Sequence, residues 1–194
     1  MTSSEEGIRG RVALVTGGSR GIGRACCRRL AKSGVHVAVN YRARQDAARQ
    51  TVVELGELGV RALAVQADVS VPEQVDAMID QVQQELGPVE LLVNNAGLFL
   101  HGAHETVSLD VWRRTLDVNL TGTYLVTWAV KPAMIQRRYG RIVNMGSKAG
   151  RFGSLFAGAN YVAAKGAMQA FTLQIAQEFG PDGITCNTLC PGAI

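Results

Sequence analysis

The sequence predicts an α/β fold in which helices cover both faces of one parallel sheet, a doubly wound arrangement. Three observations lead to this prediction. Short apolar runs, typical of buried parallel strands, alternate with helical patterns along the 194-residue chain. Each connection is long enough for the crossover helix that parallel pairing requires. No linker or low-complexity segment interrupts the alternation, so we expect a single domain over residues 10–194, after a polar tail at residues 1–9.

Six apolar runs predict the strands, at residues 11–16, 35–40, 61–66, 90–94, 141–145 and 183–189. Helical patterns fill the connections, at residues 22–32, 45–58, 70–86, 108–136 and 160–179. Gly34 marks the end of the first helix. Ser70 and Glu73 have the spacing of a capping box, which predicts the start of the third helix. Either Ser108 or Asp110 is expected to cap the fourth.

The composition is that of an ordinary globular protein, because 47% hydrophobic and 19% charged residues exclude a disordered or fibrous chain. The net charge of +4 comes from scattered arginines, and doublets such as Arg113-Arg114 favour solvated helix faces over nucleic-acid binding. No apolar run approaches the length that spans a membrane, and the polar N-terminus lacks the apolar region of a signal peptide. We therefore expect a cytoplasmic protein with no nucleic-acid or membrane partner.

The four cysteines, Cys26, Cys27, Cys186 and Cys190, have no zinc-ligand spacing and form no Cys-x-x-Cys motif. Buried, reduced thiols of a cytosolic protein are the expected interpretation. No metal site is predicted.

A glycine-rich loop, TGGSRGIG at residues 16–23, joins the first predicted strand to the first helix. In such a loop glycines let the backbone approach a pyrophosphate, and the helix N-terminus supplies free N–H groups. Its Gly-x-x-x-Gly-x-Gly spacing differs from the Gly-x-Gly-x-x-Gly of most dinucleotide sites, so a plain glycine-rich turn is the alternative interpretation.

The end of the second predicted strand indicates which nicotinamide cofactor is bound. NAD sites place an acidic residue there, on the adenosine ribose hydroxyls. This strand ends Asn40-Tyr41-Arg42 without a carboxylate, and Arg20 lies in the glycine loop. Because a guanidinium can pair with a 2′-phosphate through two hydrogen bonds, the sequence favours NADP(H).

Tyr161 and Lys165 are four residues apart in the last predicted helix and so share one of its faces. An ammonium group close to a phenol favours the phenolate, which lets the phenol exchange a proton near neutral pH. Ser147, at the end of the preceding strand, can place its hydroxyl on the same substrate oxygen. Taken alone, the Tyr-x-x-x-Lys spacing also fits an ordinary helix with a half-buried aromatic and a solvated lysine.

The order of these and further motifs resembles the short-chain dehydrogenase/reductase family, and within it the 3-oxoacyl-[acyl-carrier-protein] reductases. The resemblance covers residues 10–194 without a break. Its motifs are TGGSRGIG at 16–23, Asp68-Val69, NNAG at 94–97, Asn119, Ser147, Tyr161-x-x-x-Lys165 and Pro191-Gly192. It implies a Rossmann-type fold.

The resemblance also implies a role for each matching residue. Tyr161 would be the general acid of ketone reduction, Lys165 would assist it and hold the nicotinamide ribose, and Ser147 would polarise the carbonyl. Asn119 would bind a water that connects Lys165 to solvent. The implied cofactor-binding residues, beside Tyr161 and Lys165, are Gly17, Ser19, Arg20, Gly21, Ile22, Gly23, Asn40, Tyr41, Arg42, Asp68, Val69, Asn95, Ala96, Gly97, Pro191, Gly192 and Ile194.

Two features depart from the family's pattern. The family separates its serine and tyrosine by thirteen positions, whereas Ser147 and Tyr161 are fourteen positions apart. Lys148 stands thirteen positions before Tyr161, and a lysine has no hydroxyl for the serine's role. We therefore keep Ser147 and place the extra residue within 151–158. The family also continues through a mobile substrate-binding segment and a last strand, so with the sequence ending at Ile194 we expect a domain that lacks both.

The predicted function is an NADPH-dependent oxidoreductase (EC 1.1.1.-) that reduces a 3-oxoacyl thioester or a similar ketone to a secondary alcohol, as in fatty acid biosynthesis. Two alternatives are the same chemistry on a sugar, polyol or steroid, and a non-catalytic nucleotide-binding module. A binding module has no need of Asn119, Ser147, Tyr161 and Lys165 together. The expected partners are a small-molecule or acyl-carrier-bound carbonyl substrate and further copies of the chain, in a dimer or tetramer.

Overall fold

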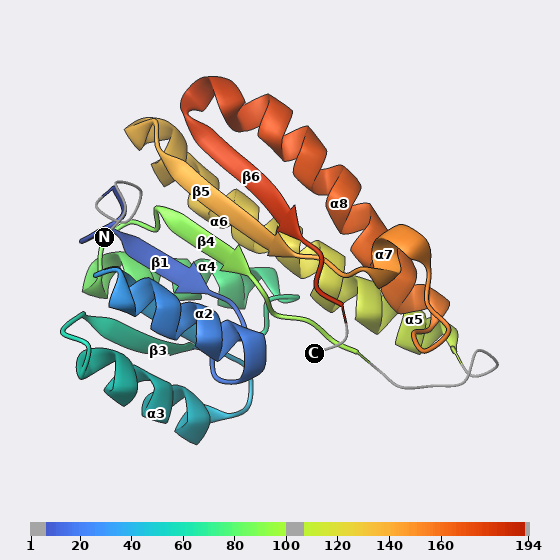
Figure 1. Ribbon diagram of the computed structural model, residues 1–194, viewed down its shortest axis with the longest axis horizontal. Coiled ribbons are helices and arrows are strands. Elements are labelled where there is room, and N and C mark those ends of the chain that lie inside the picture. The colour runs from blue at the N-terminus through green and yellow to red at the C-terminus, as the bar shows by residue number, and fades with distance from the viewer. Residues whose placement is uncertain (1–6, 100–106, 193–194) are drawn as a thin grey trace.

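The computed structural model describes residues 7–99 and 107–192, in which one sheet of six parallel strands has the order β3-β2-β1-β4-β5-β6 (Figure 1). The strands are β1 (Val12–Val15), β2 (His36–Tyr41), β3 (Ala62–Gln66), β4 (Leu91–Asn94), β5 (Gly140–Met145) and β6 (Ile184–Leu189). Each lies within one residue of its predicted range, and the predicted fold class is confirmed. The strand order reverses between β1 and β4, which is where doubly wound sheets bind ligands at the carboxyl ends of their strands.

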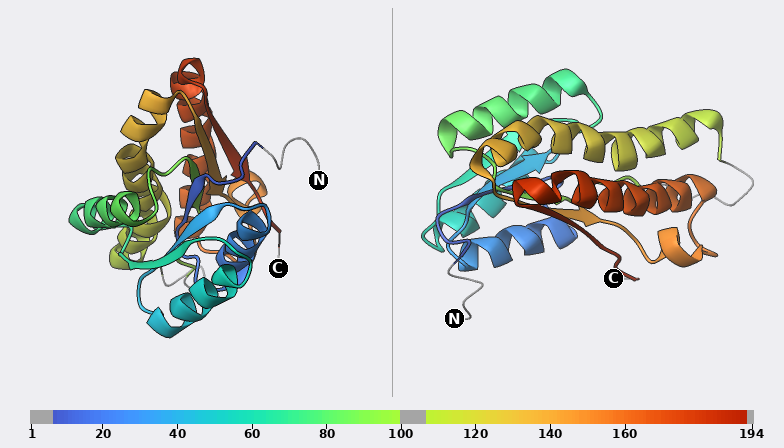
Figure 2. Two further views of the ribbon diagram at one scale, coloured as in Figure 1. Left: turned by 90° about the vertical axis from the view of Figure 1, so that its left-hand side faces the viewer. Right: turned by 90° about the horizontal axis from the view of Figure 1, so that it is seen from above.

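Helices pack on both faces of the sheet (Figure 2). One face is covered by α2 (Gly21–Lys32) and α3 (Gln45–Gly56), whose buried side chains pack against Ala13 and Val15 of β1. The opposite face is covered by α4 (Pro72–Glu85), α6 (Gly122–Arg137) and α8 (Ala159–Phe179), which pack against Leu14 among others. Because side chains alternate across a strand and both faces of the sheet centre are covered, β1 (VALV) is apolar and buried along its whole length. No helix in the described part of the chain is long and apolar enough to cross a membrane.

The predicted capping box at the start of α4 is wrong. The helix begins at Pro72 with Val71 as its N-cap residue and no side chain capping it. Ser70 instead donates its hydroxyl to the carboxylate of Asp68, at 2.6 Å. A hydrogen bond to a carboxylate is stronger than one between neutral groups, so it outcompetes the local cap.

The long predicted helix is divided into three parts, α5 (Leu109–Leu116), a π-helical turn η2 (Asp117–Thr121) and α6. Ser108 is its N-cap residue, since its Oγ accepts a hydrogen bond from the amide of Val111. The π turn contains Asn119, one of the predicted site residues. The short helices α7 (Ala149–Phe152) and η3 (Gly180–Asp182) were not predicted, because so few residues show no periodic pattern.

Candidate active site

Two adjoining cavities lie at the carboxyl ends of the strands. The first, of about 660 Å³, is lined by the glycine loop, by the segments after β2 and β3 and by residues 95–98 after β4. The second, of about 820 Å³, is lined by the same segment after β4, by the loop after β5 and by the start of α8. Both include Ile22, Asn95, Gly97 and Leu98 in their walls, so they form one elongated cleft.

All predicted site residues in the described part of the chain line this cleft. The first cavity is lined by Gly17, Ser19, Arg20, Gly21, Ile22, Gly23, Asn40, Tyr41, Arg42, Asp68, Val69, Asn95, Ala96 and Gly97. The second is lined by Asn119, Ser147, Tyr161, Lys165, Pro191 and Gly192. Ile194 lies outside the described residues.

The glycine loop is fixed by the segment that follows β4. The hydroxyl of Thr16 accepts hydrogen bonds from the amides of Asn95 and Ala96, both at 2.9 Å. The side-chain amide of Asn95 donates in return to the carbonyls of Thr16 and Gly17, at 2.9 and 3.1 Å. A Cβ at Gly23 would lie 2.3 Å from the Gly17 oxygen and 2.5 Å from Nδ2 of Asn95, so only glycine fits this turn.

The N-terminus of α2 opens into the first cavity through Gly21, Ile22 and Gly23. Its N-cap residue, Arg20, makes no side-chain capping bond, and the first turn contains no acidic residue. The first backbone N–H groups of a helix lack partners within the helix and favour an anion. A close-fitting glycine cradle with such donors fits the pyrophosphate of a dinucleotide.

Asn40 joins the glycine loop to the end of β3. Its side chain is buried, with Oδ1 accepting from the amide of Gly17 at 3.1 Å and Nδ2 donating to the carbonyl of Ala67 at 3.1 Å. An aspartate at position 40 would place a carboxylate oxygen against the Ala67 carbonyl oxygen, with no N–H group between them to donate a hydrogen bond. The amide therefore positions the glycine loop, and the predicted cofactor-binding role of Asn40 stays a prediction.

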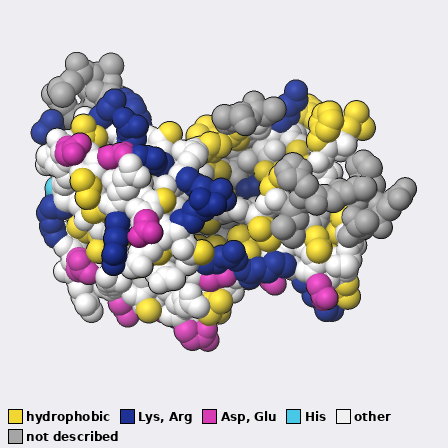
Figure 3. Space-filling view, turned by 90° about the horizontal axis from the view of Figure 1, so that it is seen from below, with side chains coloured by type: hydrophobic (Ala, Val, Ile, Leu, Met, Phe, Trp, Pro, Cys, Tyr) yellow, Lys and Arg dark blue, Asp and Glu magenta, His cyan; other side chains and the backbone are white. Residues whose placement is uncertain are grey.

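Figure 3 shows a face of the molecule on which basic side chains gather beside a hollow. Three arginines, Arg20, Arg42 and Arg44, line the first cavity. Arg44 was not predicted as a site residue from the sequence. Its position, three residues after β2 and two after Arg42, could have indicated that it lines the same cavity. Such a cavity favours an anionic ligand.

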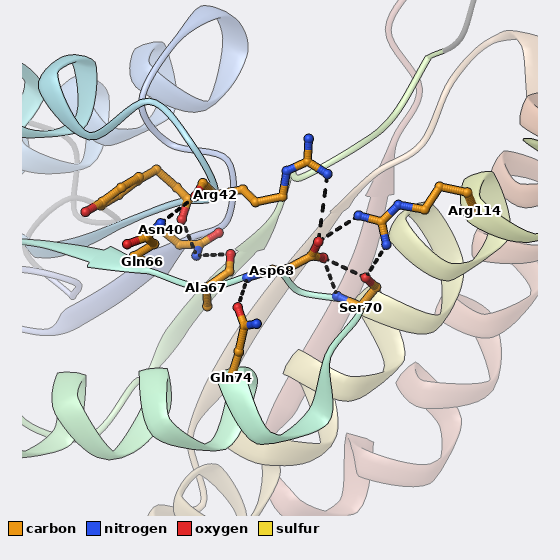
Figure 4. A network of polar contacts seen from close by, with 9 residues as sticks. Asn40, Arg42, Gln66, Ala67, Asp68, Ser70, Gln74 and Arg114 are labelled. Carbon is orange, nitrogen blue, oxygen red and sulfur yellow. Dashed lines mark hydrogen bonds and ion pairs between the residues drawn. The ribbon is translucent and has the colours of Figure 1, made fainter.

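Asp68 is the acidic residue of the first cavity, and its carboxylate is held within the protein (Figure 4). Oδ1 accepts from the amide and the hydroxyl of Ser70, at 3.0 and 2.6 Å, and Oδ2 accepts from Nη2 of Arg114 at 2.7 Å. Burial by itself would raise the pKa of Asp68, but these hydrogen bonds lower it to about 2. Arg114 was missed in the sequence, where it stood as one half of a basic doublet.

Lys165 is buried in the second cavity, with 4% of its surface exposed. Its Nζ donates to the carbonyl of Met145 at 2.6 Å and lies 5.8 Å from the ring centroid of Tyr161. Burial lowers the pKa of Lys165 to about 8. The ammonium is thus close to the half-buried phenol ring, as the four-residue spacing predicts.

We expect Lys165→Met to be more stable than the wild type at pH 7. The folded pKa of about 8 lies below the ordinary lysine value of 10.5, so folding disfavours the charged ammonium below pH 8. Methionine removes that cost but also removes the hydrogen bond to the Met145 carbonyl, so the net gain in free energy of unfolding is on the order of 1–2 kcal/mol.

Urea unfolding of both proteins between pH 7 and 10.5 measures this effect. Between pH 8 and 10.5 the unfolded wild type binds more protons than the folded one, so its free energy of unfolding should rise relative to that of Lys165→Met. The advantage of the variant should therefore shrink with pH. A variant that is less stable than the wild type at pH 7 contradicts the expectation.

Ser147 lies just before α7, which packs against the helix that carries Tyr161 and Lys165. Its Oγ accepts a hydrogen bond from the amide of Ala149 at 3.1 Å, at the start of α7. A Cβ at Gly150 would lie 2.5 Å from the Lys165 carbonyl carbon, so the backbones of α7 and α8 are in direct contact. Gly150 was missed in the sequence, because a single glycine in a loop carries no pattern.

Asn119 fixes the backbone segment between the two cavities. Its Nδ2 donates to the carbonyls of Leu98 and Thr115, both at 2.9 Å, and its Oδ1 accepts from the amide of Leu98 at 3.3 Å. The hydroxyl of Thr115 in turn accepts from Asn160, beside Tyr161. The predicted water-binding role of Asn119 stays a prediction.

The second cavity has an apolar wall. Phe99 packs edge-on against Tyr161, with ring centroids 4.9 Å apart. Leu155 and Phe156, which are almost fully exposed, and the buried Met145 line the same cavity. Leu155 and Phe156 were not predicted as site residues, because the sequence indicated only an extra residue in the segment 151–158.

Comparison with known proteins places this geometry in a family. Residues 11–194 match the family model described as short chain dehydrogenase. The chain is 41% identical to a 3-oxoacyl-[acyl-carrier-protein] reductase of Synechocystis sp. and 43% identical to an acetoacetyl-CoA reductase of Paracoccus denitrificans. Each match covers 95% of this chain and 74% of the relative.

Two solved structures have similar folds. NAD⁺-bound xylitol dehydrogenase has a TM-score of 0.90 at 35% identity, over 95% of this chain and 71% of the other. A blue fluorescent protein from a metagenomic library, in complex with NADPH, has a TM-score of 0.89 at 39% identity, over 95% and 75%. The two neighbours therefore hold different nicotinamide cofactors.

Proposed function

Because the chain belongs to the short-chain dehydrogenase family of oxidoreductases, we propose that it reduces a 3-oxoacyl thioester, or a similar ketone, with NADPH as the cofactor. The observation that carries the proposal is the arrangement of the cleft. Ser147, Tyr161 and Lys165 line one end, and the glycine cradle with its arginines lines the other. A non-catalytic nucleotide-binding module would need only the second of these ends.

The reaction assigns a task to each polar side chain of the second cavity. Bound nicotinamide supplies a hydride to the carbonyl carbon. Ser147 accepts from the Ala149 amide and directs its own proton to the carbonyl oxygen. Tyr161 gives its phenolic proton to the same oxygen as negative charge develops there, and the ammonium of Lys165, held by the Met145 carbonyl, stabilises the phenolate that remains.

The charges of the first cavity support NADPH over NADH. Three arginines line it, β2 ends without a carboxylate, and Asp68 is already paired with Arg114. An adenosine 2′-phosphate would therefore meet more positive than negative charge. NADH has no phosphate at that position and gains nothing from these guanidinium groups.

The apolar wall of the second cavity supports an acyl substrate over a sugar or polyol. Hydroxyl-rich substrates need polar partners, whereas Phe99, Leu155 and Phe156 offer only apolar surface. Two of the similar relatives are a 3-oxoacyl-[acyl-carrier-protein] reductase and an acetoacetyl-CoA reductase. A thioester-bound 3-oxoacyl group is the substrate class that fits both observations.

The test follows NADPH oxidation with an acetoacetyl thioester, a ketose and a steroid ketone, alongside titrations with NADPH and NADH. We expect turnover with the thioester and a dissociation constant for NADPH about tenfold below that for NADH. NADPH binding without reduction of any ketone would favour the binding module. Faster reduction of the ketose or the steroid would overturn the substrate class, and tighter binding of NADH would overturn the cofactor.

A further inference from the structure

We propose that Arg114 is a positioning residue that sets the preference for NADPH, because it neutralises Asp68 and so leaves Arg42 available for the 2′-phosphate. The inference rests on the proposed use of NADPH. Arg114 and Arg42 both approach Oδ2 of Asp68, one from α5 and the other from the end of β2 (Figure 4).

Arg114 holds Asp68 through a closed ring of hydrogen bonds. Nη2 donates to Oδ2 of Asp68 at 2.7 Å, and Nη1 donates to the hydroxyl of Ser70 at 2.8 Å. The Ser70 hydroxyl then donates to Oδ1 of Asp68 at 2.6 Å. Since the side chain of Asp68 is only 17% exposed, the carboxylate has its counter-ion inside the protein.

Arg42 makes the weaker contact with the same carboxylate. Its Nη1 lies 3.8 Å from Oδ2 of Asp68, and 59% of its side chain is exposed, against 37% for Arg114. An exposed ion pair at that distance adds little free energy and is easily exchanged for another anion. Arg42 can therefore turn to a phosphate in the first cavity, which it also lines.

Removing Arg114 would change the charge of the cavity rather than its shape. Asp68 would become an ionised carboxylate without its counter-ion, and it would draw Arg42 toward itself. The same negative charge would repel a 2′-phosphate. NADH has a ribose hydroxyl at that position, so its affinity should be nearly unaffected.

The test compares Arg114→Gln with the matched control Arg113→Gln. Arg113 is the exposed neighbour on α5, and its side chain makes no hydrogen bond or ion pair with the described residues. We expect Arg114→Gln to raise the dissociation constant for NADPH about tenfold, equivalent to about 1.4 kcal/mol, and that for NADH less than about twofold. Arg113→Gln should leave the ratio of the two constants unchanged, and Arg114→Lys, which keeps the charge, should retain most of the preference.

A double-mutant cycle tests the route through Asp68. In an Asp68→Asn background Arg114→Gln should no longer change the NADPH to NADH ratio, because the charge to be neutralised is gone. Should Arg114→Gln fail to fold, the single variant Asp68→Asn tests the inference. Its preference for NADPH over NADH should equal or exceed that of the wild type.

The outcomes separate this inference from the proposed function. A wild type without preference for NADPH contradicts the proposed cofactor. If the wild type prefers NADPH but Arg114→Gln raises the dissociation constants for both cofactors equally, the role of Arg114 is overturned and the proposed cofactor stands. A lower NADPH preference in Asp68→Asn would also overturn it.

Discussion

Tyr161→Phe should lower kcat and kcat/KM together by about 10³-fold, with a nearly unchanged dissociation constant for NADPH. The phenol gives its proton only as the carbonyl oxygen becomes negative, so its loss is felt in the transition state. The phenylalanine ring retains the edge-on contact with Phe99 and its position one turn before Lys165. The cleft should therefore keep its shape.

The measurement is steady-state reduction of an acetoacetyl thioester, with fluorescence titration of NADPH for affinity. Tyr124→Phe is the matched control, because Tyr124 lies on α6 and packs against Trp128, away from the residues that line the cleft. The control should retain wild-type kcat. If Tyr161→Phe retained a substantial fraction of the activity, another group would be the acid.

Gly23→Ala should raise the dissociation constants for NADPH and for NADH by at least about 10²-fold. The added Cβ would lie 2.3 Å from the Gly17 oxygen and 2.5 Å from Nδ2 of Asn95. Neither atom can move freely, because the side chain of Asn95 is bonded to the carbonyls of Thr16 and Gly17. The helix N-terminus must therefore shift away from the pyrophosphate, at a cost of about 1–3 kcal/mol in the free energy of unfolding.

Gly56→Ala is the control, since a Cβ at this last residue of α3 would meet no atom within 4 Å. It should leave affinity unchanged and be neutral or slightly stabilising. Titration of both cofactors, with urea unfolding of each variant, measures the two effects. Wild-type affinity in Gly23→Ala would show that the close contact in the loop is relieved at no cost to binding.

The strands, the order of the helices and the motifs of the cleft could be predicted from the sequence because each depends on neighbouring residues. Strands buried on both faces are apolar throughout, as in β1, and their ends are marked by glycine or polar residues. The glycine loop and the Tyr161–Lys165 pair carry their chemistry in local spacing. Since parallel strands present their carboxyl ends at one edge, these motifs also had to meet there.

The tertiary structure alone decided how these residues are held. The partner of Asp68 is Arg114, which is 46 residues away, and Arg114 also donates a hydrogen bond to Ser70, the residue predicted to cap α4. Gly150 meets the backbone at Lys165, and burial there lowers the pKa of the lysine. Charge pairing, close backbone contact and desolvation arise between segments that only folding brings together, so no local pattern in the chain carries them.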